Sequence, residues 1–292
     1  MRQLSSLVAN GKKGLIQASF VCFSLAAALN ANVDHFGFEE SFLPYYTCGP
    51  QVSLTTLCKS LYEGFQLDPS SLSEYKIPKL VHFIWLGSPL PSECEAMVRT
   101  WRECHPDWIV KVWNDADAAA FGLENQRAFD IANNYGEKSD IFRYEILYRF
   151  GGVYIDTDFE CIKPFDNLHK SCEFYTGLIG SESQLDLLNG LIGSVPGHPI
   201  IRACIDHLRI GNGDNDPERI MLDTGPYHLK EMFLKCVTEN DRGNVVALPP
   251  NFFYPYPATH RISGRNRKVI KMMYARPESW AIHYWSSSWQ KK

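Results

Sequence analysis

A helical pattern, a glycine pair, a short apolar run and two acids follow one another in mid-chain, and this succession constrains the fold most. Apolar side chains recur within 141–148 at the spacing of one helical face, and Ser139 and Asp140 are both suitable N-caps. The glycines at 151–152 end the predicted helix, because glycine enters left-handed conformations at little steric cost. The run 153–155 favours a buried strand, so the stretch predicts one helix–turn–strand unit.

Asp156 and Asp158 follow the predicted strand directly, where an α/β sheet usually opens onto its ligand. Two carboxylates held together repel each other unless a cation or a proton neutralises them, and hard oxygen ligands suit Mg²⁺ or Mn²⁺. The same Asp-x-Asp pattern occurs at 115/117, where a helix is predicted to begin, and at 214/216 in a polar loop. Only the pair at 156/158 follows an apolar strand, so it is the predicted cation site.

Strands and helices alternate on both sides of this unit. The apolar run 80–87 is typical of a central parallel strand, and alternation of this kind predicts a three-layer α/β fold with a mostly parallel sheet. The other predicted strands are 108–113, 174–179 and 244–248, and the other predicted helices begin at Ser92 or span 116–121, 125–134, 184–191, 200–208 and 226–236.

Composition excludes some classes of function. A formal net charge of -4 supplies no general attraction to polyanions, which argues against nucleic acid as the principal partner. The nine cysteines are odd in number and include no Cys-x-x-Cys pair, so free thiols in a reducing compartment are favoured over a disulfide framework or a zinc knuckle.

The N-terminal region differs in character from the rest of the chain. Residues 1–35 contain basic residues followed by an apolar run at 14–29, which predicts a secretory signal or a marginal membrane anchor, with a buried or peripheral helix as the alternative. Such a segment would export the protein or hold it at a membrane; without it the protein would be cytoplasmic. Residues 36–76 form an aromatic, turn-rich extension with a small helical region, and 77–292 form the main domain.

Three further side chains are candidates for the same crevice. Asp140 and Arg143 lie one helical turn apart and share a face, so they form either an intrahelical ion pair or a grip on sugar hydroxyl and phosphate oxygens. Trp85 ends the first strand, where it either packs in the core or stacks on a flat base.

Several separated motifs together resemble glycosyltransferase family 32, which is similar to mannosyltransferases and, more distantly, to the clostridial glucosylating toxins. The motifs are residues 77–79, 82–87, 139–158, 224–226 and 283–289. The resemblance implies a GT-A-type, Rossmann-like domain, a nucleotide-sugar donor and a divalent metal, Mn²⁺ or Mg²⁺.

The resemblance also implies roles for individual residues. Trp85 would stack on the nucleotide base, Asp140 and Arg143 would contact the donor sugar, and Asp156 and Asp158 would bind the metal diphosphate.

The family's C-terminal pattern matches four residues of this chain, of which His283 would be a metal ligand. The match consists of His283, Trp285, Ser288 and Trp289, and the last two would bind substrate. Tyr284 stands where the family often has a second histidine. Asn189 would lie near the acceptor or the donor sugar.

The implied reaction is transfer of a hexose from a UDP- or GDP-sugar to an acceptor hydroxyl, with retention of anomeric configuration. No carboxylate nucleophile stands out, which favours front-face attack. The acceptor is left open between glycan, lipid and protein, and association with a membrane is open as well. A basic segment with Arg261, Arg265, Arg267 and Lys268 either meets a phosphorylated or lipid-linked acceptor or is a solvated face.

Two other classes of function compete with transfer. The run 153–158 also fits the start of a haloacid-dehalogenase-like phosphatase, in which the first aspartate is a nucleophile, and 211–216 superficially resembles the late acidic loop of that group. The flanking patterns disagree with this assignment. A non-catalytic binding protein with a degenerate transferase fold is the second alternative.

Overall fold

The computed structural model describes residues 36–46, 52–68, 70, 72–180, 185–261 and 266–286. The signal or anchor segment expected at 1–35 lies outside these residues, as do Ser288 and Trp289. Among the residues that are described, no helix is both long enough and apolar enough to cross a membrane.

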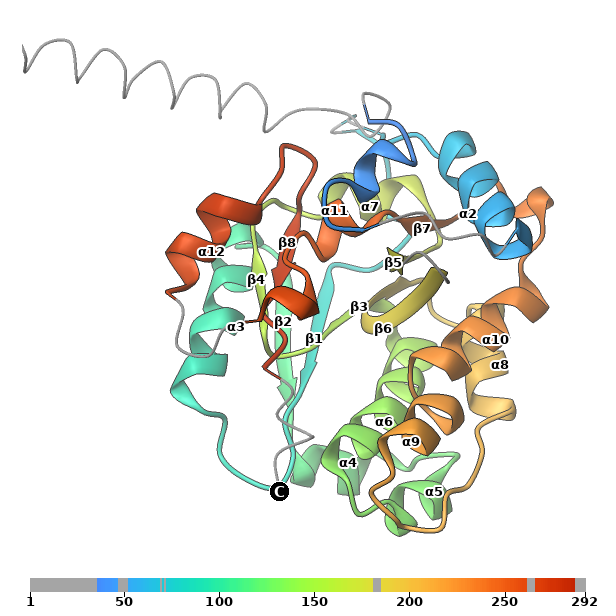
Figure 1. Ribbon diagram of the computed structural model, residues 1–292. Coiled ribbons are helices and arrows are strands. Elements are labelled where there is room, and N and C mark those ends of the chain that lie inside the picture. Colours follow the sequence, from blue (N-terminus) through green and yellow to red (C-terminus); the bar gives the residue numbers. More distant parts are fainter. Residues whose placement is uncertain are drawn as a thin grey trace, which may run out of the picture.

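A six-stranded sheet forms the centre of the molecule, in the order β2-β1-β3-β6-β5-β7 (Figure 1). Neighbours β1–β2, β1–β3 and β5–β7 are parallel, whereas β6 is antiparallel to both β3 and β5, so five of the six strands share one direction. The expected α/β class with a mostly parallel sheet is therefore confirmed. The strands are β1 (Leu80–Ile84), β2 (Ile109–Trp113), β3 (Gly152–Ile155), β5 (Phe174–Gly180), β6 (Leu185–Ser194) and β7 (Val245–Leu248).

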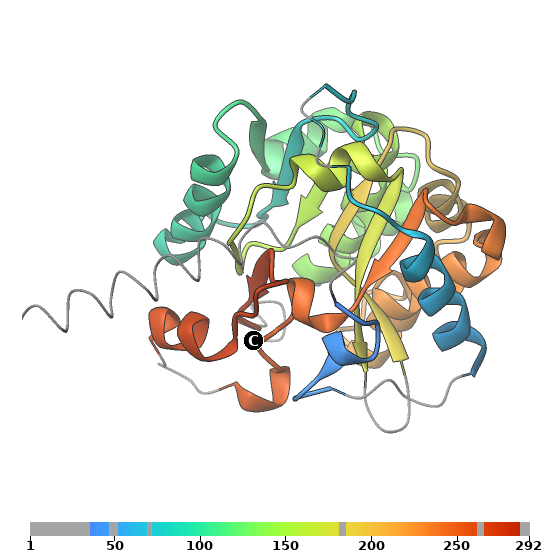
Figure 2. The same cartoon turned by 90° about the horizontal axis from the view of Figure 1, so that it is seen from above.

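Helices cover both faces of the sheet (Figures 1 and 2). On β1, Phe83 contacts Trp101 of α3, whereas the adjacent His82 bonds to the carbonyl oxygen of Gly151 at the end of α6. Because successive strand residues point to opposite faces, α3 and α6 lie in different layers. The helices are α2 (Val52–Gly64), α3 (Ser92–Cys104), α4 (Asp115–Phe121), α5 (Gln126–Ile131), α6 (Tyr135–Phe150), α7 (Asp166–Ser171), α8 (Pro199–Asp206), α9 (Pro217–Asp223), α10 (Pro226–Cys236), α11 (Pro250–Phe253) and α12 (Arg267–Tyr274), with 3-10 turns at Glu40–Phe42, Glu239–Asp241 and Ala258–His260.

Helix α6 begins earlier than the sequence predicts. The side chain of Asn134 caps it by accepting a hydrogen bond from the backbone of Gly136 at 2.7 Å, so neither Ser139 nor Asp140 is the N-cap. Asp140 lies instead in the second turn, where it is buried. The helix ends at Gly151, as expected, and the φ of +62° there favours glycine.

The predicted helix 184–191 is wrong, because residues 185–191 belong to strand β6. The spacing of its leucines is compatible with either structure, and periodicity alone does not separate a short buried strand from a helix. Pairing decides the outcome, since β6 bonds to β3 on one side and to β5 on the other. Asn189 therefore lies on a central strand beside β3.

A second, two-stranded sheet pairs β4 (Phe159–Cys161) with β8 (Ala281–His283) in antiparallel register. Phe159 lies opposite His283, and the backbone N–H of Tyr284 donates to the carbonyl oxygen of Asp158 at 3.1 Å. The sequence did not predict this pairing. It brings the C-terminal segment next to the acidic pair.

The expected small helical region before residue 77 corresponds to α2, whose Leu54 and Leu61 belong to the main hydrophobic core together with Phe65, which follows the helix. The domain boundary at residue 77 stays a prediction. Among the described cysteines, Cys94, Cys104, Cys161, Cys172, Cys204 and Cys236 are free thiols.

His169 on α7 joins three parts of the fold. It is fully buried, its Nδ1 lies 3.0 Å from the carbonyl oxygen of Pro78, and its Nε2 lies 2.8 Å from the hydroxyl of Tyr175 on β5. Burial lowers the pKa of His169 from 6.5 to about 3, so the ring stays neutral in the folded protein while the unfolded chain binds a proton.

We therefore expect His169 to make the protein acid-sensitive. Its contribution to stability is fully present above pH 6.5 and is lost as the pH falls towards 3, by up to about 1.4 kcal/mol per pH unit. Urea unfolding across this range should show a flatter pH dependence for His169→Gln than for the unchanged protein. An identical slope in the two proteins would contradict the assignment, whatever the absolute stability of the variant.

Candidate active site

Asp156, Asp158 and His283 form a cluster at the carboxyl end of β3. Each offers one ligand atom, and these atoms all lie within 4.8 Å of one another. The two aspartates follow β3 directly, and the β4–β8 pairing supplies the histidine from far along the chain. The structure thus brings together the three residues for which a metal-binding role is expected.

The carboxylate of Asp158 is held by the C-terminal segment. Its Oδ1 lies 2.9 Å from Nε2 of His283, and its Oδ2 accepts hydrogen bonds from the backbone N–H and the hydroxyl of Ser286 at 2.7 and 2.8 Å. Burial by itself would raise the pKa of Asp158, but His283 and Ser286 outweigh burial and lower it to about 2.

Asp156 is the more open of the two acids, with its side chain 33% exposed against 14% for Asp158. Its Oδ1 accepts a hydrogen bond from the hydroxyl of Tyr154 at 2.7 Å and lies 3.6 Å from Nη1 of Arg143. Burial raises the pKa of Asp156, Arg143 opposes this rise, and the charge on Asp158 adds to it. Asp156 therefore gains more from a neighbouring cation than Asp158 does.

Asp140 and Arg143 form a buried ion pair, with Nη2 of Arg143 2.8 Å from Oδ1 of Asp140. Asn189 contacts both residues. Its side-chain amide donates to Oδ1 of Asp140 at 2.8 Å, and its backbone carbonyl oxygen accepts from Nη1 of Arg143 at 2.6 Å. The guanidinium also lies 4.3 Å from the centre of the Tyr154 ring. Burial raises the pKa of Asp140 to about 6 against the opposing effect of Arg143.

Thr224 extends this network to the helices behind the sheet. Its hydroxyl donates to Oδ2 of Asp140 at 3.2 Å, and its carbonyl oxygen accepts from the hydroxyl of Tyr144 at 2.9 Å. The motif at 224–226 thus places a polar group against Asp140.

Trp85 follows β1 at the same edge of the sheet as Asp156. It is half-buried, its indole N–H donates to the hydroxyl of Ser88 at 3.0 Å, and it lines a hollow of about 310 Å³. The other residues around this hollow are Ser88, Pro89, Leu90, Glu95, Arg102, Val112 and Asn114. The flat indole ring of Trp85 therefore lies beside this hollow.

The donor set of the cluster fits a hard divalent cation. Two carboxylates and an imidazole suit Mn²⁺ or Mg²⁺, and the partly exposed Asp156 leaves one side open. Within the described part of the chain, Nδ1 of His283 is buried without a hydrogen-bond partner. The ring is fixed by stacking on Phe159, at 4.4 Å between centroids and an interplanar angle of 12°.

Sequence reasoning missed three polar side chains of the site: Tyr154, Ser286 and Thr224. Tyr154 precedes Asp156 by two residues, so strand alternation places both side chains on one face and could have identified it. Ser286 is the first of three consecutive serines, and no pattern distinguishes it from the expected Ser288. Trp285 does lie beside the cluster, with its ring 4.2 Å from His283.

The other two Asp-x-Asp pairs have structural contacts instead. Asp117 completes a capping box with Asn114 at the start of α4. Asp214 pairs with Arg219 at 2.6 Å, and Asp216 caps α9. Asp156 and Asp158, by contrast, lie beside His283 in a group that could hold a metal ion, so the choice of this pair as the cation site stays a prediction.

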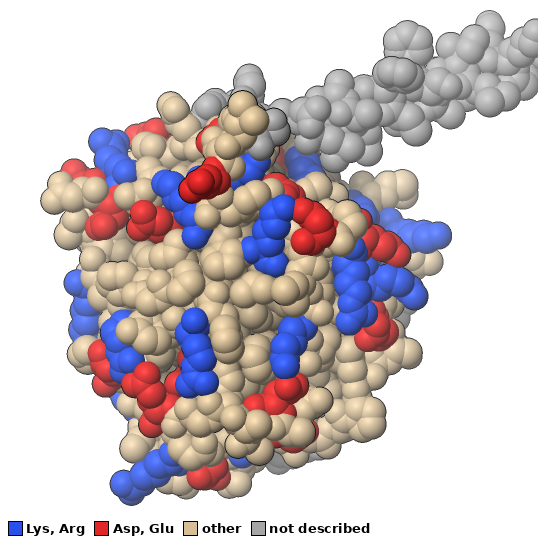
Figure 3. All heavy atoms as spheres, turned by 180° about the vertical axis from the view of Figure 1, so that it is seen from behind, with Lys and Arg blue, Asp and Glu red and all other residues tan. Residues whose placement is uncertain are grey.

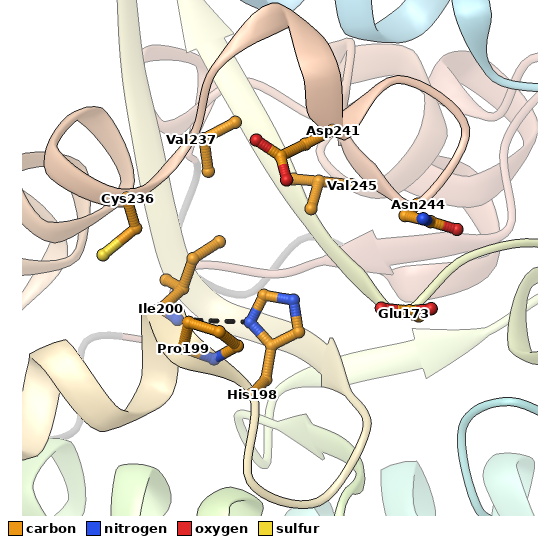
Figure 4. Close-up of a pocket in the computed structure, with 9 residues that line it drawn as sticks. All are labelled: Glu173, His198, Pro199, Ile200, Cys236, Val237, Asp241, Asn244 and Val245. Carbon is orange, nitrogen blue, oxygen red and sulfur yellow. Dashed lines mark hydrogen bonds between the residues drawn. The ribbon is translucent and has the colours of Figure 1, made fainter.

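A smaller hollow of about 130 Å³ lies at the opposite edge of the sheet, where β5 and β7 begin (Figure 4). The ring of His198 points into it, while Nδ1 of that ring accepts a hydrogen bond from the backbone of Ile200 at 3.2 Å. Its lining residues are Glu173, His198, Pro199, Ile200, Cys236, Val237, Asp241, Asn244 and Val245. None of the expected site residues lines this hollow.

Comparison with known proteins shows which proteins this chain is similar to. Residues 91–175 match the family described as "Glycosyltransferase sugar-binding region containing DXD motif". Inositol phosphoceramide mannosyltransferase 1 of Schizosaccharomyces pombe is 31% identical over 211 residues, which cover 67% of this chain and 65% of that protein. Mannosyl phosphorylinositol ceramide synthase SUR1 of Saccharomyces cerevisiae is 31% identical over 137 residues, covering 46% and 35%. The solved PaToxG glycosyltransferase has a TM-score of 0.43 and 17% identity, covering 63% of this chain and 76% of that one.

Residues 91–175 thus match the family of glycosyltransferase sugar-binding regions that contain a DXD motif. The expected resemblance to glycosyltransferase family 32 is confirmed by this match and by the similarity to the yeast mannosyltransferases. The chain spans less than two thirds of the length of the two yeast relatives.

The buried ion pair predicts a strong coupling between Asp140 and Arg143. Arg143→Met should lower the free energy of unfolding by about 3–5 kcal/mol, because it leaves Asp140 charged and buried without its partner. The double variant Arg143→Met with Asp140→Leu should lose less than the sum of the two single variants, with a coupling of about 1–3 kcal/mol in urea unfolding.

The exposed pair between Lys59 and Glu39 is the matched control. Its side chains are 40% and 56% exposed, so Lys59→Met should change stability by less than about 1 kcal/mol. Strictly additive effects of the Asp140 and Arg143 substitutions would contradict the proposed coupling.

Proposed function

We propose that the chain is a metal-dependent glycosyltransferase that moves a hexose from a nucleotide sugar to an acceptor hydroxyl. The observation that carries this proposal is the cluster of Asp156, Asp158 and His283 beside the buried Asp140–Arg143 pair. A cation site and a polar grip at one edge of the sheet suit a substrate with both a diphosphate and a sugar.

Asp156, Asp158 and His283 would hold Mn²⁺ or Mg²⁺ through oxygen and nitrogen ligands. A divalent ion there supplies positive charge to the diphosphate that departs in the reaction. Ser286 keeps Asp158 oriented, and Tyr154 does the same for Asp156.

Residues around the cluster would bind the other groups of the donor. Asp140, Arg143 and Asn189 would orient the sugar hydroxyls, and Trp85 would stack on the base beside its hollow. Ser288 and Trp289 would close over the diphosphate, as the family resemblance implies.

Retention by front-face attack is part of this proposal. A double-displacement route needs a carboxylate free to attack the sugar, and Asp140 is already paired with Arg143 at 2.8 Å. Positioning of donor and acceptor would then supply most of the rate enhancement.

A ceramide-type glycolipid is the acceptor class that we propose, with a mannosyl nucleotide as the first donor to test. The support is the names of the two relatives, a mannosyltransferase that acts on inositol phosphoceramide and a mannosyl phosphorylinositol ceramide synthase. A lipid acceptor implies that the chain works at a membrane surface. Glycan and protein acceptors are the alternatives.

The direct test is release of UDP or GDP from a panel of nucleotide hexoses in the presence of Mn²⁺. Asp156→Asn should lower the rate about 100-fold or more, because it removes a charge from the cation site, and chelation should abolish the activity. Asp214→Asn, in an exposed Asp-x-Asp pair, is the matched control and should leave the rate unchanged.

Two outcomes would contradict the proposal. Hydrolysis of simple phosphate esters without a nucleotide sugar would indicate a phosphatase. No release from any donor, with the fold intact, would indicate a non-catalytic binding protein.

Gly190 on β6 allows a finer test of the cation site. A Cβ at this position would lie 2.7 Å from Oδ2 of Asp156, so Gly190→Ala should displace that carboxylate without removing it. We expect Mn²⁺ affinity, measured by calorimetry, to fall by about 10-fold or more.

Gly122→Ala is the control for this substitution, because nothing lies within 4 Å of the added Cβ. It introduces backbone strain at a φ of +71° but should leave Mn²⁺ affinity unchanged. Equal affinities for Gly190→Ala and the unchanged protein would show that Asp156 does not bind the ion.

A further inference from the structure

Helix α12 turns an apolar stripe outward. Ile270 and Tyr274 are buried, whereas Val269, Met272 and Met273 are 39%, 79% and 45% exposed. At 3.6 residues per turn the three exposed side chains share one side of the helix, next to the side that carries the buried pair. Surface helices normally present polar residues there, so this face is unusual.

The same segment is strongly basic, although the whole chain has a net charge of -4. Lys268 is exposed and lies one turn from Met272 on the outward face. Residues 261–276 include no aspartate or glutamate and six basic residues, namely Arg261, Arg265, Arg267, Lys268, Lys271 and Arg276.

We propose that the outward face of α12 docks on an anionic lipid bilayer. Val269, Met272 and Met273 would enter the boundary between headgroups and acyl chains, and Arg267 and Lys268 at the start of the helix would meet lipid phosphates. A short amphipathic helix with apolar residues between basic ones is the chemistry of interfacial membrane binding. The positive charge and the lack of acids in the segment favour a lipid surface over an uncharged protein partner.

The position of α12 in the fold agrees with such a role. It lies at the periphery of the molecule in both ribbon views, outside α3 and β8 (Figures 1 and 2). On the face seen from behind the view of Figure 1, acidic and basic side chains are interspersed (Figure 3).

The inner side of α12 is connected to the candidate active site. Lys271 pairs with Glu160 of β4 at 2.6 Å, and the same carboxylate accepts a hydrogen bond from the hydroxyl of Tyr284 at 2.6 Å. Arg261 donates to the carbonyl oxygen of Ser286 at 3.3 Å, and Ser286 bonds to Asp158. A bilayer on α12 would thus lie next to the strands that carry the cluster.

Docking would bring the headgroup of a membrane lipid to the cluster, and this part of the inference rests on the proposed function. The binding of α12 to lipid does not depend on it. The two statements can therefore be tested separately.

Co-sedimentation of the full chain with vesicles tests the docking surface. We expect tighter binding to phosphatidylcholine vesicles with about 30% phosphatidylserine than to phosphatidylcholine alone. Arg267→Gln with Lys268→Gln should weaken binding about 5-fold or more per charge. Met272→Ser with Met273→Ser should weaken it about 10-fold or more. Leu234→Ser on α10, where the leucine is 43% exposed, is the control and should change nothing.

Hydrogen exchange locates the contact, because residues 1–35 could bind vesicles independently of α12. Amides of 267–274 should become protected when vesicles are added, and those of 226–236 should not. Binding without protection of α12, or binding equal in all variants, would overturn the proposal. Protection that appears at high protein concentration without vesicles would indicate a contact between two copies and would also overturn it.

Release of UDP or GDP in solution separates this inference from the proposed function. The α12 variants should retain Mn²⁺-dependent donor hydrolysis and lose transfer to an acceptor embedded in vesicles. Donor hydrolysis without vesicle binding would overturn the docking surface alone. Vesicle binding through α12 without hydrolysis of any donor would overturn the proposed function alone.

Discussion

The guanidinium of Arg143 is the charge on which the site depends. It lies between two buried or half-buried carboxylates, 2.8 Å from Asp140 and 3.6 Å from Asp156, and its own exposure is only 4%. Without a positive charge here, two acids in a low-dielectric region would repel each other and take up protons. Helix α6, strand β3 and strand β6 pack in an arrangement that supplies the partners of this one side chain.

The site also requires the C-terminal strand β8 to pair with β4. Asp158 follows β3, but its partners His283 and Ser286 come from β8 and the residues after it. A three-residue antiparallel pairing is enough to fix them, because the aromatic stack of His283 on Phe159 reinforces the register. The cluster is therefore a product of tertiary structure, whereas the Asp-x-Asp motif is a product of local sequence.

This difference explains how much could be predicted from the sequence. The strands β1, β2, β3, β5 and β7, the end of α6 at Gly151 and the position of Asp156 and Asp158 directly after β3 follow from local patterns, and the structure agrees with them. The cap at Asn134 was missed because Ser139 and Asp140 are equally good caps by type. Strand β6 was mistaken for a helix because only its two neighbours distinguish the alternatives. The role of Ser286 depends on a pairing between distant segments that no local pattern contains.

Asp156 and Asp158 have different environments in the structure. Asp158 is tied to the C-terminal segment and stays ionised down to a pKa of about 2, whereas Asp156 keeps a third of its side chain open to solvent. Asp158 thus holds the C-terminal segment in place, whereas the partly exposed carboxylate of Asp156 is accessible to a ligand. Substitutions around Asp156 would therefore change a partly exposed carboxylate, whereas substitutions around Asp158 would disturb the contact with the C-terminal segment.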